Sequence, residues 1–285
     1  MVQKQKRIFY NFREEKLKDK WRFIDLDKID GFKSAALFES IAKNVGGNVS
    51  PETILFWRAR SPVVYLGYHQ CVEDEINVDH CRNHDIGIVR RILGGGCGFC
   101  DENQILFSCI GKEGGIIPPD IQAAYTKVLG AVVNALHTLG TAGEIEPTRN
   151  AVYSNGRKIS GNAQGRLDGA VLINGSLLMD FDFELMDRVL KNPTKNLYPV
   201  ANARDGMITL NDIGITDIDL VKKALLNGFE KALGITTYEG MLSENEINTA
   251  NQLSQKYRCY DWIYRMDIKR AQRKRFSALS PQRAG

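Results

Sequence analysis

The sequence predicts an α+β fold in which mixed, largely antiparallel sheets are flanked by helices. Short apolar runs typical of strands are mixed with longer segments of helical periodicity. They do not follow the regular strand–helix–strand rhythm that a parallel α/β sheet requires. The chain has 285 residues, of which 43% are hydrophobic and 25% are charged. This composition is typical of a folded globular protein.

Helix and strand signals alternate through the first half of the chain. Residues 31–44 repeat apolar side chains at helical spacing and stop before a pair of glycines. The longest predicted helix covers 120–139, with Pro119 near its start and Gly140 after its end. Strands are predicted at 54–57, 63–67, 86–90 and 105–110, the last of these as the return strand after a glycine-rich loop.

Residues 152–159 carry a strong β-hairpin signal, because Asn155-Gly156 suits a two-residue turn. Pairing across that turn places Tyr153 opposite Lys158 and Val152 opposite Ile159. Side chains alternate between the two faces of a strand. If the aliphatic pair faces the core, Lys158 faces a surface or a cleft.

The second half of the chain continues the mixture of strands and helices. Strands are predicted at 170–173 and 176–179, and Asp182 caps a helix that Pro193 ends. Further helices are predicted near 217–233 and 243–257. The latter opens with Ser243 and Glu246, which have the spacing of a capping box.

The segment from Arg90 to Asp101 contains two arginines followed by three consecutive glycines. Glycine has no Cβ, so backbone N–H groups in such a run approach a ligand closely. Free N–H groups and neighbouring guanidinium groups favour an anion. The segment therefore predicts a binding loop for a phosphorylated or carboxylated ligand.

Six cysteines at irregular spacing do not form a disulfide framework in a chain of this length. We find no secretory signal and no apolar run long enough to span a membrane. We therefore expect a cytoplasmic protein with reduced thiols. A zinc site remains possible, with ligands from His80, Cys81, His84, Cys97 and Cys100. A redox dithiol formed by Cys97 and Cys100 also remains possible. Two small residues that fill a turn are the favoured interpretation of that pair.

Positive charge is concentrated at the two ends of the chain. Residues 1–20 contain seven Lys or Arg and three acidic residues, and residues 257–285 contain eight Lys or Arg and two Asp. The remaining part is acidic, because the whole chain carries only +4. A basic end is often a solvated tail, but it also suits an acidic partner.

Four motifs in order along the chain resemble the lipoate–protein ligase family, within the superfamily of biotin and lipoate ligases and octanoyltransferases. These motifs are Leu66–Gln70, Arg90–Asp101, Pro147–Asn150 with Gly156–Gln164, and Asn174–Asp180. The resemblance runs from Trp21 to Trp262. It implies a catalytic domain at 21–262, a basic extension at 1–20 and a basic tail at 263–285.

The resemblance implies a two-step reaction. ATP, with Mg²⁺, converts the carboxylate of lipoate to lipoyl-AMP, and a lysine of a lipoyl carrier domain then attacks the mixed anhydride. Expected carriers are the acyltransferase subunit of a 2-oxoacid dehydrogenase or the glycine cleavage H protein. No nucleic-acid or membrane partner is expected.

The resemblance also implies the site residues. Lys158 matches the family's central lysine, which contacts the acyl carbonyl and the phosphate. The full set expected to bind lipoate or ATP is Arg91, Gly94, Gly95, Gly96, Cys97, Cys100, Asp101, Asn150, Lys158, Ser160, Gly161, Ala163, Gly175 and Ser176.

The sequence departs from the family pattern in three places. Cys100-Asp101 stands where the family has His-Asp, and Asn174-Gly175 stands where it has His-Gly. Only 23 residues follow Trp262, too few for the accessory domain of many bacterial ligases. A separate accessory subunit is one expected remedy. The basic tail would then contact that subunit or an acidic lipoyl domain.

Two other functions are considered. An octanoyl or lipoyl transferase uses a cysteine thioester instead of ATP. One transferase group places that cysteine just before the Gly-Arg-Lys hairpin, where this chain has Pro147–Asn150. No cysteine lies between Cys109 and Cys259. The other alternative is a non-catalytic module that binds zinc or a carrier domain.

Overall fold

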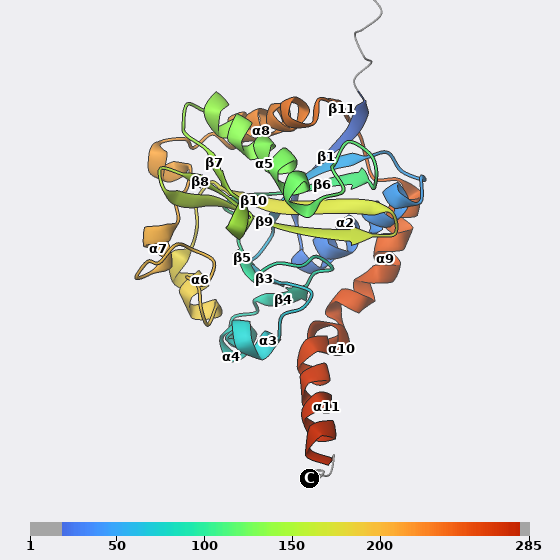
Figure 1. The fold of residues 1–285 in the computed structure, drawn as a ribbon, viewed down its shortest axis with the longest axis vertical. Helices are drawn as coiled ribbons and strands as arrows, with labels where there is room; N and C mark the ends of the chain where they lie inside the picture. Colours follow the sequence, from blue (N-terminus) through green and yellow to red (C-terminus); the bar gives the residue numbers. More distant parts are fainter. Residues whose placement is uncertain (1–18, 280–285) are drawn as a thin grey trace, which may run out of the picture.

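An eight-stranded mixed sheet forms the centre of the molecule (Figure 1). The computed structural model describes residues 19–279. The strand order is β11-β1-β2-β6-β10-β9-β8-β7. β1 is parallel to β11 and β2, and the other neighbours are antiparallel. The bounds are β1 (Lys20–Ile29), β2 (Thr53–Ala59), β6 (Gln104–Lys112), β7 (Glu144–Glu146), β8 (Ala151–Ser154), β9 (Arg157–Leu167), β10 (Ala170–Leu178) and β11 (Thr236–Glu239). The predicted α+β class is confirmed.

Helices cover both faces of this sheet, because its central strands are apolar on both sides. In β2, Ile54 and Phe56 join the core under α5 and α8, while Leu55 and Trp57 join the core under α2 and α9. Strands buried on two faces lack the polar alternation of a half-exposed strand. The helices are α2 (Gly31–Gly46), α5 (Ile121–Thr138), α8 (Ile218–Leu233) and α9 (Glu244–Arg258).

A second sheet of three strands lies beside the first, in the order β4-β3-β5. Short helices and loops pack around it over a third apolar cluster. In Figure 1 this sheet lies below the large one, with α6 and α7 to its left. The elements are β3 (Val63–Leu66), α3 (Val72–Glu75), α4 (Val78–Asn83), β4 (Gly87–Arg90), β5 (Gly98–Cys100), η1 (Pro147–Arg149), α6 (Phe183–Val189), α7 (Ala203–Gly206) and η2 (Asn211–Ile213).

The local predictions are largely confirmed, with three corrections. The two strands predicted on either side of Asn174 are the single strand β10. The return strand β6 pairs with β2 and β10 and not with β4. Tyr153 pairs with Lys158 as predicted, but Val152 pairs with Ser160 because a register shift lies between Val152 and Tyr153. Such a bulge adds a residue to one strand.

The chain ends in α10 (Tyr260–Ile263) and α11 (Arg265–Leu279). Figure 1 shows α11 extending away from the body of the molecule. The described part of the segment predicted as a basic tail is therefore largely helical. Residues 1–18 of the predicted extension at 1–20 lie outside the described residues.

Candidate active site

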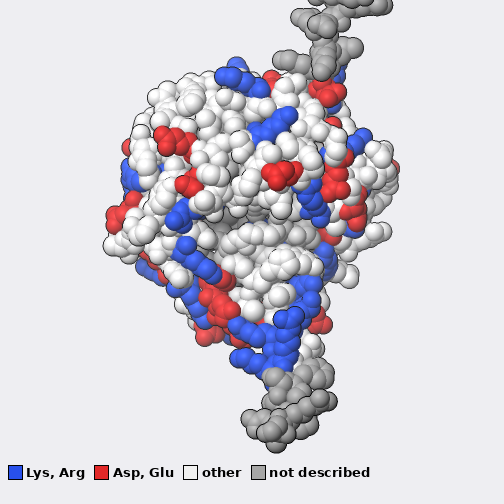
Figure 2. All heavy atoms as spheres, in the orientation of Figure 1, with Lys and Arg blue, Asp and Glu red and all other residues white. Residues whose placement is uncertain are grey.

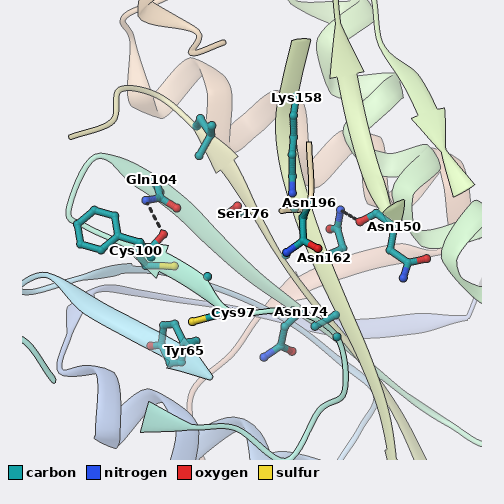
Figure 3. A pocket seen from close by; sticks show the side chains of 18 of the residues that line it. Tyr65, Cys97, Cys100, Gln104, Asn150, Lys158, Asn162, Asn174, Ser176 and Asn196 are labelled. Atoms are coloured by element: carbon teal, nitrogen blue, oxygen red, sulfur yellow. Dashed lines mark hydrogen bonds between the residues drawn. The ribbon is translucent and has the colours of Figure 1, made fainter. Parts of the chain in front are cut away.

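A cavity of about 320 Å³ lies where the two sheets meet (Figure 3). Strands of both sheets and the segment around α6 contribute to its wall. Much of this wall is apolar, with Phe38, Trp57, Leu106, Leu178, Phe181, Met186 and Leu197 among its residues. An apolar cavity with a few convergent polar groups is the usual form of a small-molecule site.

Lys158 supplies the amine of this cavity. It lies near the start of β9, and Figure 3 shows its side chain pointing into the cavity, as the hairpin alternation predicts. Within residues 19–279 its Nζ has no hydrogen bond and no carboxylate partner. Burial, with a smaller contribution from the positive charge of Arg149, lowers the pKa of Lys158 to about 8. An amine with that pKa exchanges protons readily at physiological pH.

Gly161 makes room for the Lys158 amine on the same strand. A Cβ at this position would lie 3.1 Å from Cε and 3.3 Å from Nζ of Lys158. Both distances are shorter than ordinary van der Waals contact. A larger residue at 161 would therefore displace the amine.

Arg149 and Asn150 line the cavity close to Lys158, at the end of η1. The Arg149 guanidinium lies over the ring of Tyr198, at 4.7 Å. Asn150 has a left-handed backbone, with φ 49° and ψ 49°. Its carbonyl accepts a 3.1 Å hydrogen bond from the side chain of Asn162, while its own Oδ1 is buried without a partner within the described residues. A donor on a bound molecule would satisfy that oxygen.

The glycine loop is shaped by Arg91, which is buried. Its guanidinium donates to the carbonyls of Tyr65, Gly94 and Gly96 at 2.6–3.0 Å. The N–H of Gly94 donates to the Gln164 carbonyl on β9, which fixes the loop against the large sheet. Arg91 therefore holds the loop in place, and its donor groups are largely used within the protein. Its expected role as an open charge for a bound anion is not what the geometry shows.

Arg90 is fully buried and, like Arg91, donates hydrogen bonds to backbone carbonyls. It donates to the carbonyls of Gly67, Tyr68, Trp262 and Ile263 at 2.8–3.1 Å. These contacts join the glycine loop to the C-terminal helices. The two arginines of the motif are thus structural cations.

Cys97 and Cys100 both line the cavity. Burial raises the pKa of the Cys97 thiol to about 12 and raises that of Cys100 as well. The nearby charge of Arg91 acts in the opposite direction but does not overcome burial. Because the thiolate is the nucleophile, neither cysteine is activated in this state.

The zinc alternative is not supported by the placement of its ligands. His80 and Cys81 lie in α4 with His84 at its C-cap, apart from the two cavity cysteines. Among residues 19–279, no three His, Cys, Asp or Glu side chains gather in a way that would hold a metal ion.

The cavity brings together most of the predicted site residues. Those that line it are Arg91, Gly95, Gly96, Cys97, Cys100, Asn150, Lys158, Gly161, Ala163, Gly175 and Ser176. Gly94, Asp101 and Ser160 do not. Asp101 is buried and accepts from the backbone N–H groups of Asn103 and Asp182, which fixes the loop before β6. Ser160 accepts a hydrogen bond from Asn162 and so helps to position it.

Three asparagines in the wall were not predicted. Asn162 and Asn174 lie within the quoted motifs, so the motifs themselves carried the signal. Asn196 lies in the segment between α6 and α7. Its Nδ2 would be 2.5 Å from a Cβ at Gly96, so it packs on the glycine loop. No local sequence pattern predicts this long-range contact.

A protein-family model matches most of this chain. Residues 30–230 match the model described as the lipoyl protein ligase A/B catalytic domain. The chain belongs to this family. The resemblance predicted from the motifs is therefore confirmed.

Solved structures of this family share the fold. A lipoate–protein ligase A bound with ATP is 25% identical, with a TM-score of 0.77, over 87% of this chain and 99% of that one. A bi-partite lipoate protein ligase from Thermoplasma acidophilum, solved in a study that includes its E2 lipoyl domain, is 26% identical, with a TM-score of 0.76. That match covers 87% of this chain and 97% of the other.

The curated relatives correct the predicted activity. Octanoyltransferase LipM of Clostridioides difficile strain 630 is 28% identical over 84% of this chain and 97% of its own length. Further octanoyltransferases of the same name align over nearly their whole length. The expectation of an ATP-dependent lipoate–protein ligase is therefore wrong. The chain is also 30% identical to lipoate–protein ligase 2 of Staphylococcus aureus strain Mu50, over 75% of this chain and 64% of that protein, so resemblance to the family did not separate the two activities.

None of the helices within residues 19–279 has the length and apolar character of a membrane-spanning segment.

Proposed function

We propose that this member of the lipoyl ligase A/B family transfers an octanoyl or lipoyl group from a thioester onto a lysine of a lipoyl carrier domain, without ATP. The proposal rests on the amine of Lys158, which lines a largely apolar cavity and has no carboxylate beside it among residues 19–279. Whole-length similarity to octanoyltransferases supports the same chemistry.

The apolar cavity binds the acyl chain, and Lys158 lies at the reacting carbonyl end of that chain. The neutral Lys158 amine accepts a proton from the ammonium group of the carrier lysine. That lysine then attacks the thioester carbonyl, and the protonated Lys158 stabilises the resulting oxyanion. The nitrogen of the adduct loses its extra proton to solvent, the C–S bond breaks, and the leaving thiolate takes the proton from Lys158. The products are an amide and a free thiol.

We further propose that no enzyme cysteine carries the acyl group. Pro147–Asn150 occupy the place before the hairpin where one transferase group has its cysteine. The cavity thiols, Cys97 and Cys100, have raised pKa values and are therefore poor nucleophiles. Direct transfer between donor and acceptor is sufficient, because a thioester is already an activated acyl group.

The test mixes octanoyl-coenzyme A or an octanoyl carrier protein with an unmodified lipoyl domain and the enzyme, without ATP. Intact-mass spectrometry should show one octanoyl group on the domain. Cys97→Ala and Cys100→Ala should retain transfer, whereas Lys158→Ala should lose about 100-fold or more of the rate. Transfer that requires octanoic acid and ATP would contradict the proposal. A stable octanoyl adduct on Cys97 or Cys100 would contradict direct transfer.

A further inference from the structure

We propose that the outer face of α11 docks a carboxylate-rich face of the carrier domain that receives the acyl group. This inference rests on the proposed function. It concerns the face formed by Arg265, Lys269 and Arg273, which we call the basic stripe.

The basic stripe follows from helical spacing. Arg265, Lys269 and Arg273 are four residues apart, so they share one side of α11. Lys269 and Arg273 are exposed, and no acidic side chain within residues 19–279 pairs with any of the three. Like charges at this spacing repel one another by about 0.2–0.5 kcal/mol per pair. A partner with carboxylates would relieve that repulsion.

The acidic groups near α11 are held on its other side. Asp267 is buried and accepts from the backbone N–H groups of Val72 and Glu73 at 2.9 and 3.2 Å. Arg270 forms ion pairs with Asp74 at 2.8 Å and Glu73 at 3.0 Å. These contacts fix α11 against α3. The helix is therefore attached along its inner side, and Lys269 and Arg273 of the stripe face solvent at a defined position.

The stripe begins beside the cavity. The Arg265 guanidinium lies over the rings of Tyr68, at 4.3 Å, and Trp262, at 4.9 Å. Gly67, which precedes Tyr68, packs closely on the glycine loop, since a Cβ at Gly67 would lie only 2.1 Å from the carbonyl oxygen of Gly95. Gly95 is an exposed residue of the cavity wall. A domain that inserts its lysine into the cavity therefore lies close to the stripe.

Charge favours an acidic protein over a nucleic acid. Figure 2 shows Lys and Arg side chains gathered over α11 at the lower end of the molecule, with both signs of charge mixed elsewhere on that face. Residues 21–256 carry a net negative charge. A nucleic-acid-binding domain is typically basic as a whole, whereas here the positive charge is confined to the two ends of the chain. A compact domain with a local cluster of carboxylates needs only the stripe.

The experiment compares the wild-type chain with the double variant Lys269→Glu/Arg273→Glu. Affinity for an unmodified lipoyl domain is measured by calorimetry at about 50 mM and about 300 mM salt. We expect at least 10-fold weaker binding for the variant at low salt and a smaller difference at high salt. Transfer to a short lysine peptide should remain unchanged, because the peptide does not reach the stripe.

The matched control is Lys223→Glu/Lys231→Glu on α8, which makes the same change of charge on exposed lysines elsewhere. It should bind the domain as the wild type does. Equal loss in both variants, or no loss in the α11 variant, would overturn the inference. So would a DNA oligonucleotide that binds the stripe more tightly than the lipoyl domain.

Binding is measured without turnover, which separates this inference from the proposed function. If the wild-type chain binds the domain through the stripe but transfers no octanoyl group, the function is wrong and the docking surface stands. If transfer to the domain proceeds with the same KM in both double variants, the function stands and the docking surface is wrong.

Discussion

Lys158 is half-buried in the cavity wall and has no counter-ion within residues 19–279. Within the described residues its nearest charged influence is Arg149, which has the same sign. Desolvation and like charge both disfavour the ammonium form. The same two effects that cost stability therefore give the residue a proton affinity suited to catalysis near neutral pH.

This environment predicts a pH dependence. The usual pKa of lysine, about 10.4, falls to about 8 in this site, so the neutral amine forms as the pH rises through about 8. The rate at saturating donor should rise over the same interval. In Arg149→Gln the removal of a positive charge should shift the rise to higher pH. Initial rates between about pH 6.5 and 9 test this, and a profile that is identical in both proteins would contradict it.

Gly161 allows a test of the position of the amine without changing the amine itself. Gly161→Ala places a methyl group against Lys158, so we expect a rate at least about 10-fold lower, corresponding to about 1.4 kcal/mol. Thermal stability should change little, because Lys158 is free to swing away. Gly130→Ala in α5, outside the cavity wall, is the control, since a Cβ there would lie at an ordinary contact distance of 3.7 Å from the Ala232 Cβ. Equal rates for the two variants would show that the amine position is not critical.

At the scale of elements, one side chain connects α9 to β1 of the large sheet. Glu246 accepts from the Ser243 backbone N–H at 2.8 Å and thereby completes the capping box predicted from sequence. The same carboxylate forms a buried ion pair with Arg22 on β1. Arg22 in turn donates to Thr53 on β2. A local cap and a long-range contact are thus combined in one residue.

Removing that carboxylate should be costly. Glu246→Ala leaves the Arg22 guanidinium buried without its partner, and we expect a loss of about 3–5 kcal/mol in the free energy of unfolding. Urea denaturation measures the change. Glu244→Ala, in the same first turn but exposed, should lose less than about 0.5 kcal/mol. Similar losses in the two variants would mean that the ion pair contributes no more than the helix terminus.

At the scale of the whole molecule, the C-terminal helices are part of the site's support. Arg90 binds the carbonyls of Trp262 and Ile263, and Asp267 caps α3 from α11. The segment that sequence alone describes as a basic tail is therefore connected to the glycine loop. The predicted need for a separate accessory subunit stays a prediction.

Loss of the Asp267 cap should loosen this connection. In Asp267→Ala the N–H groups of Val72 and Glu73 lose their acceptors, so their amide hydrogens should exchange at least about 10-fold faster. Affinity for the lipoyl domain should fall as well, because the basic stripe loses its fixed position. Asp261→Ala, an exposed change in α10, is the control. Unchanged exchange at both amides would show that α11 is held by other contacts.

Sequence alone determined the features that depend on neighbouring residues. Asp182 and Ser243 accept hydrogen bonds from the first turns of their helices, as predicted from residue type and spacing. The Asn155-Gly156 turn placed Tyr153 opposite Lys158. The ordered motifs identified the family. They did not identify the reaction, because the chain is similar both to octanoyltransferases and to a lipoate–protein ligase.

Only the tertiary structure decided which groups face the cavity and which support it. Arg91 became a structural cation because carbonyls from β3 and the glycine loop surround it. Asn196 joined the wall through a segment about 100 residues away from Gly96 in the chain. Asp267 of α11 accepts a hydrogen bond from the N–H of Val72, and no local sequence pattern predicts that contact. Local signals specify caps, turns and alternation, whereas the burial and partners of a charged side chain depend on segments that meet only in the folded chain.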